Sequence, residues 1–190
     1  MPVVETSKFV FGNKAEQLYP LTMEILGHIE NEVAIDEETA QKARMVLIEL
    51  LTNAIKHGGA AECTLEVIAA EDKVIIKKSD IGEALVIRSE GALYQWPLPG
   101  VHQGGRSITI YGDGICNLKG SLANSRRVRF FIEENIKPNA GEIRNLPEHF
   151  GLMIITRACQ AFEYEFDIAT CTNNFTATLA VGLQTKKHTV

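Results

Sequence analysis

Glu49, Asn53 and His57 recur at every fourth position in the run ELLTNAIKHG, and their side chains could together hold a water, a metal ion and a phosphate. At about 100° per residue they fall on one stripe of a helix, with Lys56 on the same arc. Asparagine is a poor helix former, so its place in mid-helix needs an explanation. The spacing suggests a nucleotide site. A plain solvated face is the alternative, although such faces usually carry Glu, Lys, Arg and Gln.

The helix that would carry this stripe is expected over residues 37–57. Asp36 can cap its first turn, in which two glutamates complement the helix dipole. Glycines at 58 and 59 are typical of a helix end. Apolar residues fall on the side opposite the polar stripe: Ala43, Leu47, Leu50, Leu51 and Ala54.

A second signal, Asp80-Ile81-Gly82, directly follows an expected strand over residues 73–78. The carboxylate can accept a hydrogen bond from an exocyclic amine, and the glycine lets a flat ring approach the backbone. An ordinary turn explains the same three residues, and this alternative stays open.

A third signal is Gly151-Leu152, at the start of a helix expected over residues 152–162. Free backbone N–H groups at a helix start bind phosphate, and glycine gives access to them. The alternative is a loop glycine that leads into a core helix.

The other expected elements surround these signals. Asn13 and Glu16 resemble a capping box before a helix with Leu18, Leu21, Ile25 and Ile29. The segment 83–147 is rich in glycine and proline, and Leu85–Ile87 is its weakest strand candidate. Alternation or β-rich composition predicts strands at residues 7–11, 62–69, 107–111, 128–132, 163–168 and 175–183.

Size and composition indicate one domain over residues 1–190. The formal charge of -5 gives no reason to expect nucleic-acid binding. No apolar run reaches the roughly 20 residues that span a bilayer, and the N-terminus does not resemble a signal peptide. The four cysteines are widely spaced, which favours reduced thiols, a cytoplasmic location and no cysteine metal site.

The order of the three signals resembles the GHKL, or Bergerat-fold, ATPase superfamily. Within it the chain looks most like anti-sigma-factor serine kinases, a group of histidine-kinase-like ATPase domains. The resemblance covers residues 7–183 and is strongest at residues 49–58 and 151–155. It implies an α+β two-layer sandwich, with a mixed, mostly antiparallel sheet and helices on one face.

The resemblance also implies roles on the long helix. Glu49 would be the general base that deprotonates a water or a protein hydroxyl. Asn53 would coordinate Mg²⁺ through its side-chain oxygen, a hard ligand for a hard cation. Lys56 and His57 would contact phosphate.

At the other two signals the resemblance implies contacts to the nucleotide. Asp80 would bind the adenine of ATP, and Gly82 would lie beneath the ring. Gly151 and Leu152 would close the phosphate pocket.

The remaining segment departs from the family. Residues 83–147 form an atypical insertion or lid, and the glycine-rich part at 100–114, with Arg106, is the candidate for the lid. Ala84 and His149 stand where the family commonly has glycines, which would stiffen loops around the nucleotide.

The function that the resemblance implies is a Mg-ATP-dependent serine/threonine kinase or ATPase. It would act on a protein partner, either sigma-factor-like or anti-sigma antagonist-like, without nucleic acid or membrane, and a homodimer is compatible with it. A non-catalytic nucleotide-sensing or protein-interaction module is the alternative. An unrelated α/β protein with chance motifs is a third reading.

Overall fold

The computed structural model describes residues 6–57, 59–89, 91–101, 105–112, 115–134 and 150–182. Strand β1 (Thr6–Phe11) leads into helices α1 (Ala15–Glu32) and α2 (Glu37–His57), followed by the hairpin β2 (Cys63–Ala70) and β3 (Lys73–Ile81). Then come β4 (Val86–Ser89), β5 (Ala92–Gln95), β6 (Arg106–Gly112), β7 (Cys116–Leu122) and β8 (Arg127–Glu134). Helix α3 (Phe150–Ala158) and the hairpin β9 (Ala161–Asp167) and β10 (Thr172–Ala180) complete the described chain.

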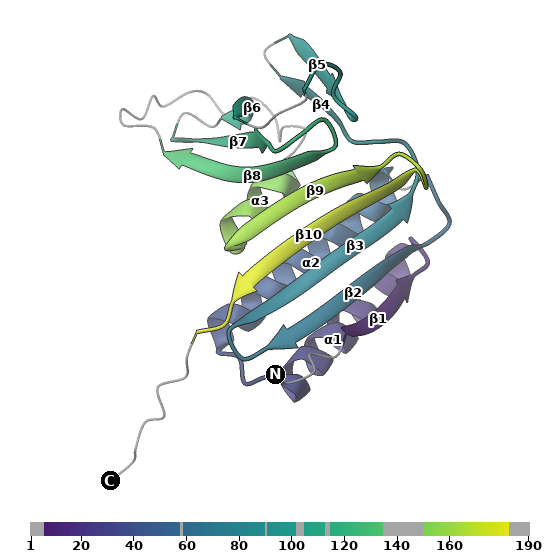
Figure 1. Cartoon of the computed structure of the whole chain (residues 1–190). Helices are drawn as coiled ribbons and strands as arrows, with labels where there is room; N and C mark the ends of the chain where they lie inside the picture. Colours follow the sequence, from purple (N-terminus) through teal and green to yellow (C-terminus); the bar gives the residue numbers. More distant parts are fainter. Residues whose placement is uncertain are drawn as a thin grey trace.

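Eight strands form one sheet in the order β1-β2-β3-β10-β9-β8-β7-β6, and β4 and β5 form a separate two-stranded sheet. All three helices lie behind the main sheet in the view of Figure 1. They pack chiefly on β1, β2, β8, β9 and β10, whereas β6 and β7 continue the sheet beyond these main helix contacts. No helix in the described ranges is both long enough and apolar enough to cross a membrane.

The expected fold class is wrong. Strands hold 44% of the described residues and helices 31%, so the protein is mostly β. Every strand pairing in the eight-stranded sheet is antiparallel, so the sheet is not mixed. The structure is therefore dominated by one large antiparallel sheet whose strands β6 and β7 extend beyond the main helix contacts, so it is not a clear α+β two-layer sandwich of the Bergerat type.

The error comes from the segment 83–147, whose glycines and prolines favoured an insertion. Three of its strands, β6, β7 and β8, instead extend the main sheet. Gly120 shows why a glycine can stand inside a strand here, because a Cβ on it would lie 2.7 Å from Cγ2 of Val128. Glycine in a strand often marks such a close approach and not a loop.

Two further local expectations are wrong. The capping box at Asn13 does not form, because α1 begins at Ala15 and the Asn13 side chain donates to the Ala60 carbonyl instead. The third helix ends at Ala158, and Phe162 belongs to β9. The end of the last expected strand, at residue 183, lies outside the described residues.

Helix α2 begins and ends as predicted. The backbone N–H of Thr39 donates to Oδ1 of Asp36 at 2.8 Å, so Asp36 caps the first turn. Hydrogen bonding with the side chain of Thr39, and after it with the Thr39 backbone, lowers the pKa of the Asp36 carboxyl below its usual value. The buried face of α2 contains all five residues expected there, and its C-terminal half presents the polar stripe.

Candidate functional site

The start of α3 lies directly against the polar stripe of α2. A Cβ built on Gly151 would lie only 2.6 Å from Oε2 of Glu49 and 3.6 Å from Nδ2 of Asn53. Real Cβ atoms essentially never approach another atom so closely, so only glycine fits without a shift of the carboxylate. The structure thus brings together Glu49, Asn53 and Gly151 from two elements that are distant in sequence.

Glu49 is half-buried between the two helices. Burial raises the pKa of its carboxyl above the usual value, and the positive charge of Lys56 acts in the opposite direction. A carboxylate with a raised pKa is a better proton acceptor at near-neutral pH. Asn53 is also half-buried, and its side-chain amide has no hydrogen-bond partner within the described ranges, so its oxygen is free to bind a ligand.

The remaining predicted residues on these helices differ in exposure. Lys56 and His57 are exposed in the last turn of α2, where they can reach a ligand from the solvent side. Leu152 is buried and forms part of the core, and its side chain carries no polar group that could contact a ligand. The described residues contain no cluster of three or more His, Cys, Asp or Glu that could hold a metal.

A cation at this place would therefore depend on Asn53 and on the ligand's own oxygens. That donor set fits Mg²⁺, which usually keeps several waters and takes one or two protein oxygens together with substrate phosphates.

The turn after β3 adjoins the end of the same helix. A Cβ on Gly82 would lie 3.5 Å from the backbone nitrogen of Gly59, two residues past the last residue of α2. The turn after β3 therefore lies beside the residues that follow α2, whereas the start of α3 lies against the polar stripe of α2 itself.

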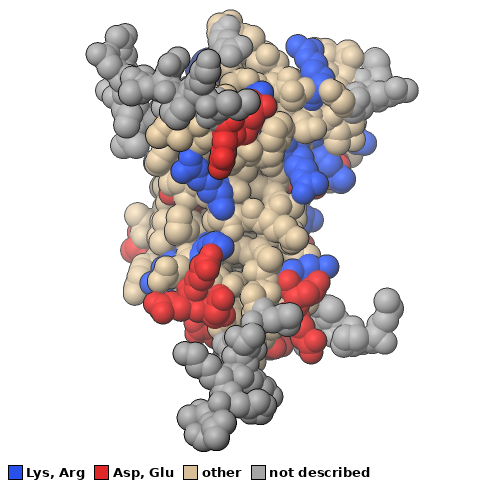
Figure 2. Space-filling view, turned by 90° about the vertical axis from the view of Figure 1, so that its left-hand side faces the viewer, with Lys and Arg blue, Asp and Glu red and all other residues tan. Residues whose placement is uncertain are grey.

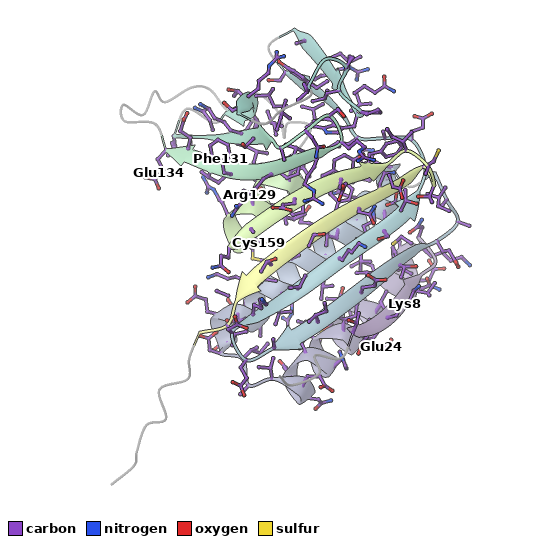
Figure 3. All side chains as sticks on the ribbon, in the orientation of Figure 1. Lys8, Glu24, Arg129, Phe131, Glu134 and Cys159 are labelled. Atoms are coloured by element: carbon purple, nitrogen blue, oxygen red, sulfur yellow. The ribbon has the colours of Figure 1, made fainter. Side chains whose placement is uncertain are left out.

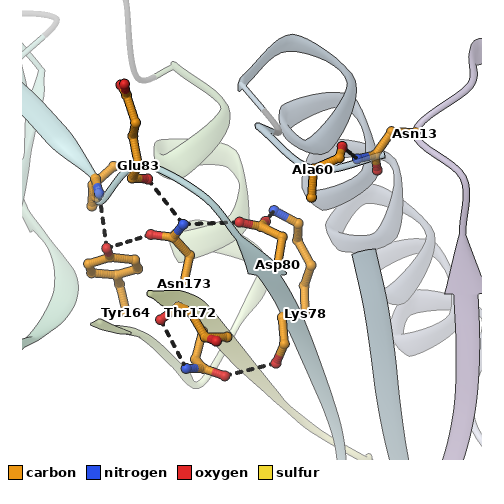
Figure 4. A network of polar contacts seen from close by, with 11 residues as sticks. Asn13, Ala60, Lys78, Asp80, Glu83, Tyr164, Thr172 and Asn173 are labelled. Atoms are coloured by element: carbon orange, nitrogen blue, oxygen red, sulfur yellow. Dashed lines mark hydrogen bonds and ion pairs between the residues drawn. The ribbon is translucent and has the colours of Figure 1, made fainter. Parts of the chain in front are cut away.

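Asp80 is not free, because a buried polar network surrounds it (Figure 4). Lys78 makes a direct ion pair with Oδ2 of Asp80, and Nδ2 of Asn173 donates to Oδ1 at 3.0 Å. The same Nδ2 also donates to the carbonyl of Glu83 at 3.1 Å. The hydroxyl of Tyr164 donates to Oδ1 of Asn173 at 2.7 Å and accepts from the backbone N–H of Leu85 at 2.9 Å.

Strand alternation explains why this network forms. Lys78 and Asp80 are two apart on β3, so they share the face that also buries Val74 and Ile76. Asn173 on β10 lies directly opposite Asp80 in the register. Sequence reasoning missed Lys78, Tyr164 and Asn173. The alternation of β3 was a usable signal for Lys78, because it places this lysine on the same face as Asp80 and the apolar Val74 and Ile76.

Burial also affects the ionisation of groups around the network. It raises the pKa of the Tyr164 hydroxyl far above its usual value, so this hydroxyl stays protonated and can donate. It raises the pKa of Cys63 to about 11. It raises that of Cys159 to about 12. The thiols of Cys63 and Cys159 are therefore poor nucleophiles at neutral pH.

Arg106 is not brought to the other candidates. It is exposed at the start of β6, the edge strand, and β10, β9, β8 and β7 separate β6 from β3. The candidate lid at 100–114 lies partly outside the described residues, as does His149. Ala84 is partly buried against the core.

Two hollows lined by described residues lie elsewhere. One, of about 720 Å³, lies between β8, α3 and the start of β9, and Arg129, Phe131 and Cys159 mark it in Figure 3. Figure 2 shows the molecule from the left-hand side of Figure 3, the side on which these three residues are labelled. Lys and Arg side chains lie on both sides of the middle of this face. The other, of about 450 Å³, is lined by residues of β3, β9 and β10 and by Arg126 and Arg127. Neither is lined by a predicted site residue.

No known protein-family model matches this chain, and no curated protein matches it.

Proposed function

We propose that this chain binds Mg-ATP between the polar stripe of α2 and the turn after β3, and that it is a regulatory protein related to the GHKL ATPases. It would be a cytoplasmic serine/threonine kinase or ATPase of the anti-sigma-factor type. Its partner would be a sigma-factor-like or anti-sigma antagonist-like protein. The observation that carries this proposal is the contact of Gly151 with Glu49 and Asn53.

Each residue has a defined task in the proposed reaction. Glu49 accepts the proton of a serine or threonine hydroxyl, or of a water. The oxygen so freed forms a bond to the γ-phosphorus, while the bond from that phosphorus to the β–γ bridging oxygen breaks and ADP leaves. Phosphoryl transfer needs mainly positioning and charge neutralisation, which Lys56 and the backbone N–H groups at the start of α3 support.

The test is Glu49→Ala, assayed with radiolabelled ATP. We expect transfer or hydrolysis to be lost while nucleotide binding remains, because the carboxylate acts on the proton and does not hold the ligand. Glu37→Ala, an exposed glutamate in the first turn of the same helix, is the matched control and should keep full activity. Turnover that survives Glu49→Ala would remove Glu49 as the base.

A second candidate is a nucleotide sensor or protein-interaction module without catalysis. The observation that favours it is the state of Asp80, because both of its carboxylate oxygens already accept hydrogen bonds within the protein. Thermal unfolding with Mg-ATP tests whether the protein binds a nucleotide at all, whether or not it is a catalyst. A ligand at 100 times its Kd stabilises by about 2.7 kcal/mol, so binding should raise the Tm by several degrees. An unchanged Tm at millimolar Mg-ATP would refute nucleotide binding of either kind.

A further inference from the structure

Strand β8 continues past the end of its pairing with β9. On one side β8 pairs with β7 as far as Glu134. On the other side it pairs with β9 only as far as Phe130, which lies opposite Phe162. The two strands diverge from that point, and α3 is visible between them in Figure 1. Within the described ranges, residues 131–134 therefore present an open edge of β8, and this edge borders the hollow of about 720 Å³.

The register shows which backbone groups this open edge offers. The N–H of Phe166 donates to the carbonyl of Arg126 at 3.0 Å, across the paired ends of β9 and β8. Because successive residues of a strand direct their backbone groups to alternate sides, every second residue after Arg126 also faces the β9 side. Ile132 and Glu134 belong to this series and lie beyond the paired part. Their N–H and C=O groups therefore point into the hollow.

The side chains around the hollow are apolar and basic. Phe131 and Ile132 supply apolar surface from β8, and Arg129 and Arg157 supply positive charge from β8 and from the last turn of α3. Glu134 is the one acidic side chain among the described residues that line it. Arg129 is exposed and makes no ion pair with another described residue. The local charge is thus positive on a chain whose formal net charge is -5, which favours an acidic ligand.

The hollow lies where β9 would continue along β8 if it began earlier in the chain. Four residues of a strand span about 13 Å, so the open edge is long enough to pair with a short extended peptide. On such a peptide, a side chain opposite Phe131 would lie diagonally across from Arg129. Diagonal neighbours in a sheet are about 7–8 Å apart, within reach of long side chains, so an acid at that position could pair with the guanidinium.

We propose that the open edge of β8 binds an extended, acidic peptide segment of a protein partner by strand addition. In this mode of recognition the main-chain hydrogen bonds give affinity and the side-chain contacts give specificity. The added strand would also cover backbone groups that otherwise form an open sheet edge. The inference goes beyond the proposed function, because it names a partner surface and does not require nucleotide.

The first experiment measures the Kd of a fluorescent, end-capped hexapeptide of alternating glutamate and valine by anisotropy, without nucleotide. The matched peptide has serine in place of glutamate, and we expect it to bind at least about tenfold more weakly. Arg129→Gln should weaken the acidic peptide about tenfold, the loss expected for one hydrogen bond between charged groups. Arg88→Gln, at an exposed arginine on β4, is the control and should keep the original Kd. Equal affinity for the two peptides, or no binding at about 1 mM acidic peptide, would overturn the inference.

Hydrogen exchange of single backbone amides tests the pairing itself. At saturating peptide, the N–H groups of Ile132 and Glu134 should exchange at least about tenfold more slowly, because they gain acceptors. The N–H groups of Phe131 and Glu133 point to β7, with which β8 already pairs, so their exchange should not change. If the acidic peptide binds and the exchange of Ile132 and Glu134 stays the same, it does not add a strand at this edge.

A ligand-side measurement covers the case in which Arg129→Gln does not fold. The acidic peptide can be N-methylated at every second residue, in both possible phases, which removes the N–H donors of one edge at a time. At least one of the two methylated peptides should bind the unmodified protein about tenfold more weakly. Equal affinity of both with the parent peptide would overturn strand addition. Displacement of the peptide by an equal concentration of free glutamate would do the same, because the hollow would then bind only a carboxylate.

Discussion

Replacement of Gly151 by alanine tests whether the close approach of α3 to α2 positions the general base. The added Cβ would lie 2.6 Å from Oε2 of Glu49, whereas ordinary contact begins at 3.4 Å. The carboxylate must therefore move by about 0.8 Å, because it is the flexible end of a side chain and the helix backbone is not. A misplacement of about 1 Å in a catalytic group can cost on the order of 100-fold in rate.

We expect Gly151→Ala to lower kcat for ATP hydrolysis or transfer by about 10- to 100-fold while the protein stays folded. Alanine is about 1 kcal/mol better than glycine inside a helix, which offsets part of the cost of the displaced side chain. The assay combines steady-state ADP release with a thermal melt of the same preparation. The Tm should change little compared with the change in rate.

Gly27→Ala is the matched control. Gly27 lies inside α1, and a Cβ on it would meet nothing within 4 Å, so this substitution makes the same chemical change without a contact. It should keep kcat and raise the Tm slightly. A Gly151→Ala protein that turns over ATP within about twofold of the original rate would refute the claim that this contact positions Glu49.

Two other predictions concern the charge and the polar network of the site. The positive charge of Lys56 lowers the pKa of Glu49 and so opposes the upward shift caused by burial. Lys56→Met should therefore raise that pKa further. Because a base must be deprotonated to act, the acid limb of the pH–rate profile should move to higher pH. Lys42→Met, at an exposed ion pair earlier in α2, should leave the profile in place, and an unmoved limb in Lys56→Met would contradict the assignment. Tyr164→Phe leaves two buried hydrogen-bond partners unsatisfied, which should lower the free energy of unfolding by about 1–3 kcal/mol in chemical denaturation. Tyr19→Phe, at a side chain 65% exposed, should change it by less than about 0.5 kcal/mol, and equal effects of the two would show that the network does not stabilise the fold.

Local features of the chain were predictable where a strong period and clear end signals agreed. Helix α2 has its predicted bounds, 37–57, and Asp36 caps it as expected. The hairpin of β2 and β3 was also visible, because alternation and the intervening polar residues both favoured it. The proximity of Gly151 to Glu49 followed only from the order of the three signals, and no property of either residue alone predicts it.

The fold class was not predictable in the same way, because the sheet is completed by weakly patterned strands. β7 (CNLKGSL) contains a glycine and alternates incompletely, so composition alone favoured a loop. Its strand character depends on its partners β6 and β8, and pairing of this kind overrides local preference. The capping box at Asn13 failed for a similar reason, since a contact with Ala60, far along the chain, uses that side chain.

The proposed phosphate end lies against the side of α2, whereas the proposed base end lies beside the residues just beyond the C-terminus of that helix. Glu49 and His57 are about 12 Å apart along the axis of α2 at 1.5 Å per residue, and Gly82 contacts Gly59, just beyond the helix end. Asp80 takes its partners from β3 and β10, whereas Glu49 lies against the start of α3. No hydrogen bond or ion pair among the described residues joins these two groups, so the polar contacts around Asp80 are separate from those around Glu49.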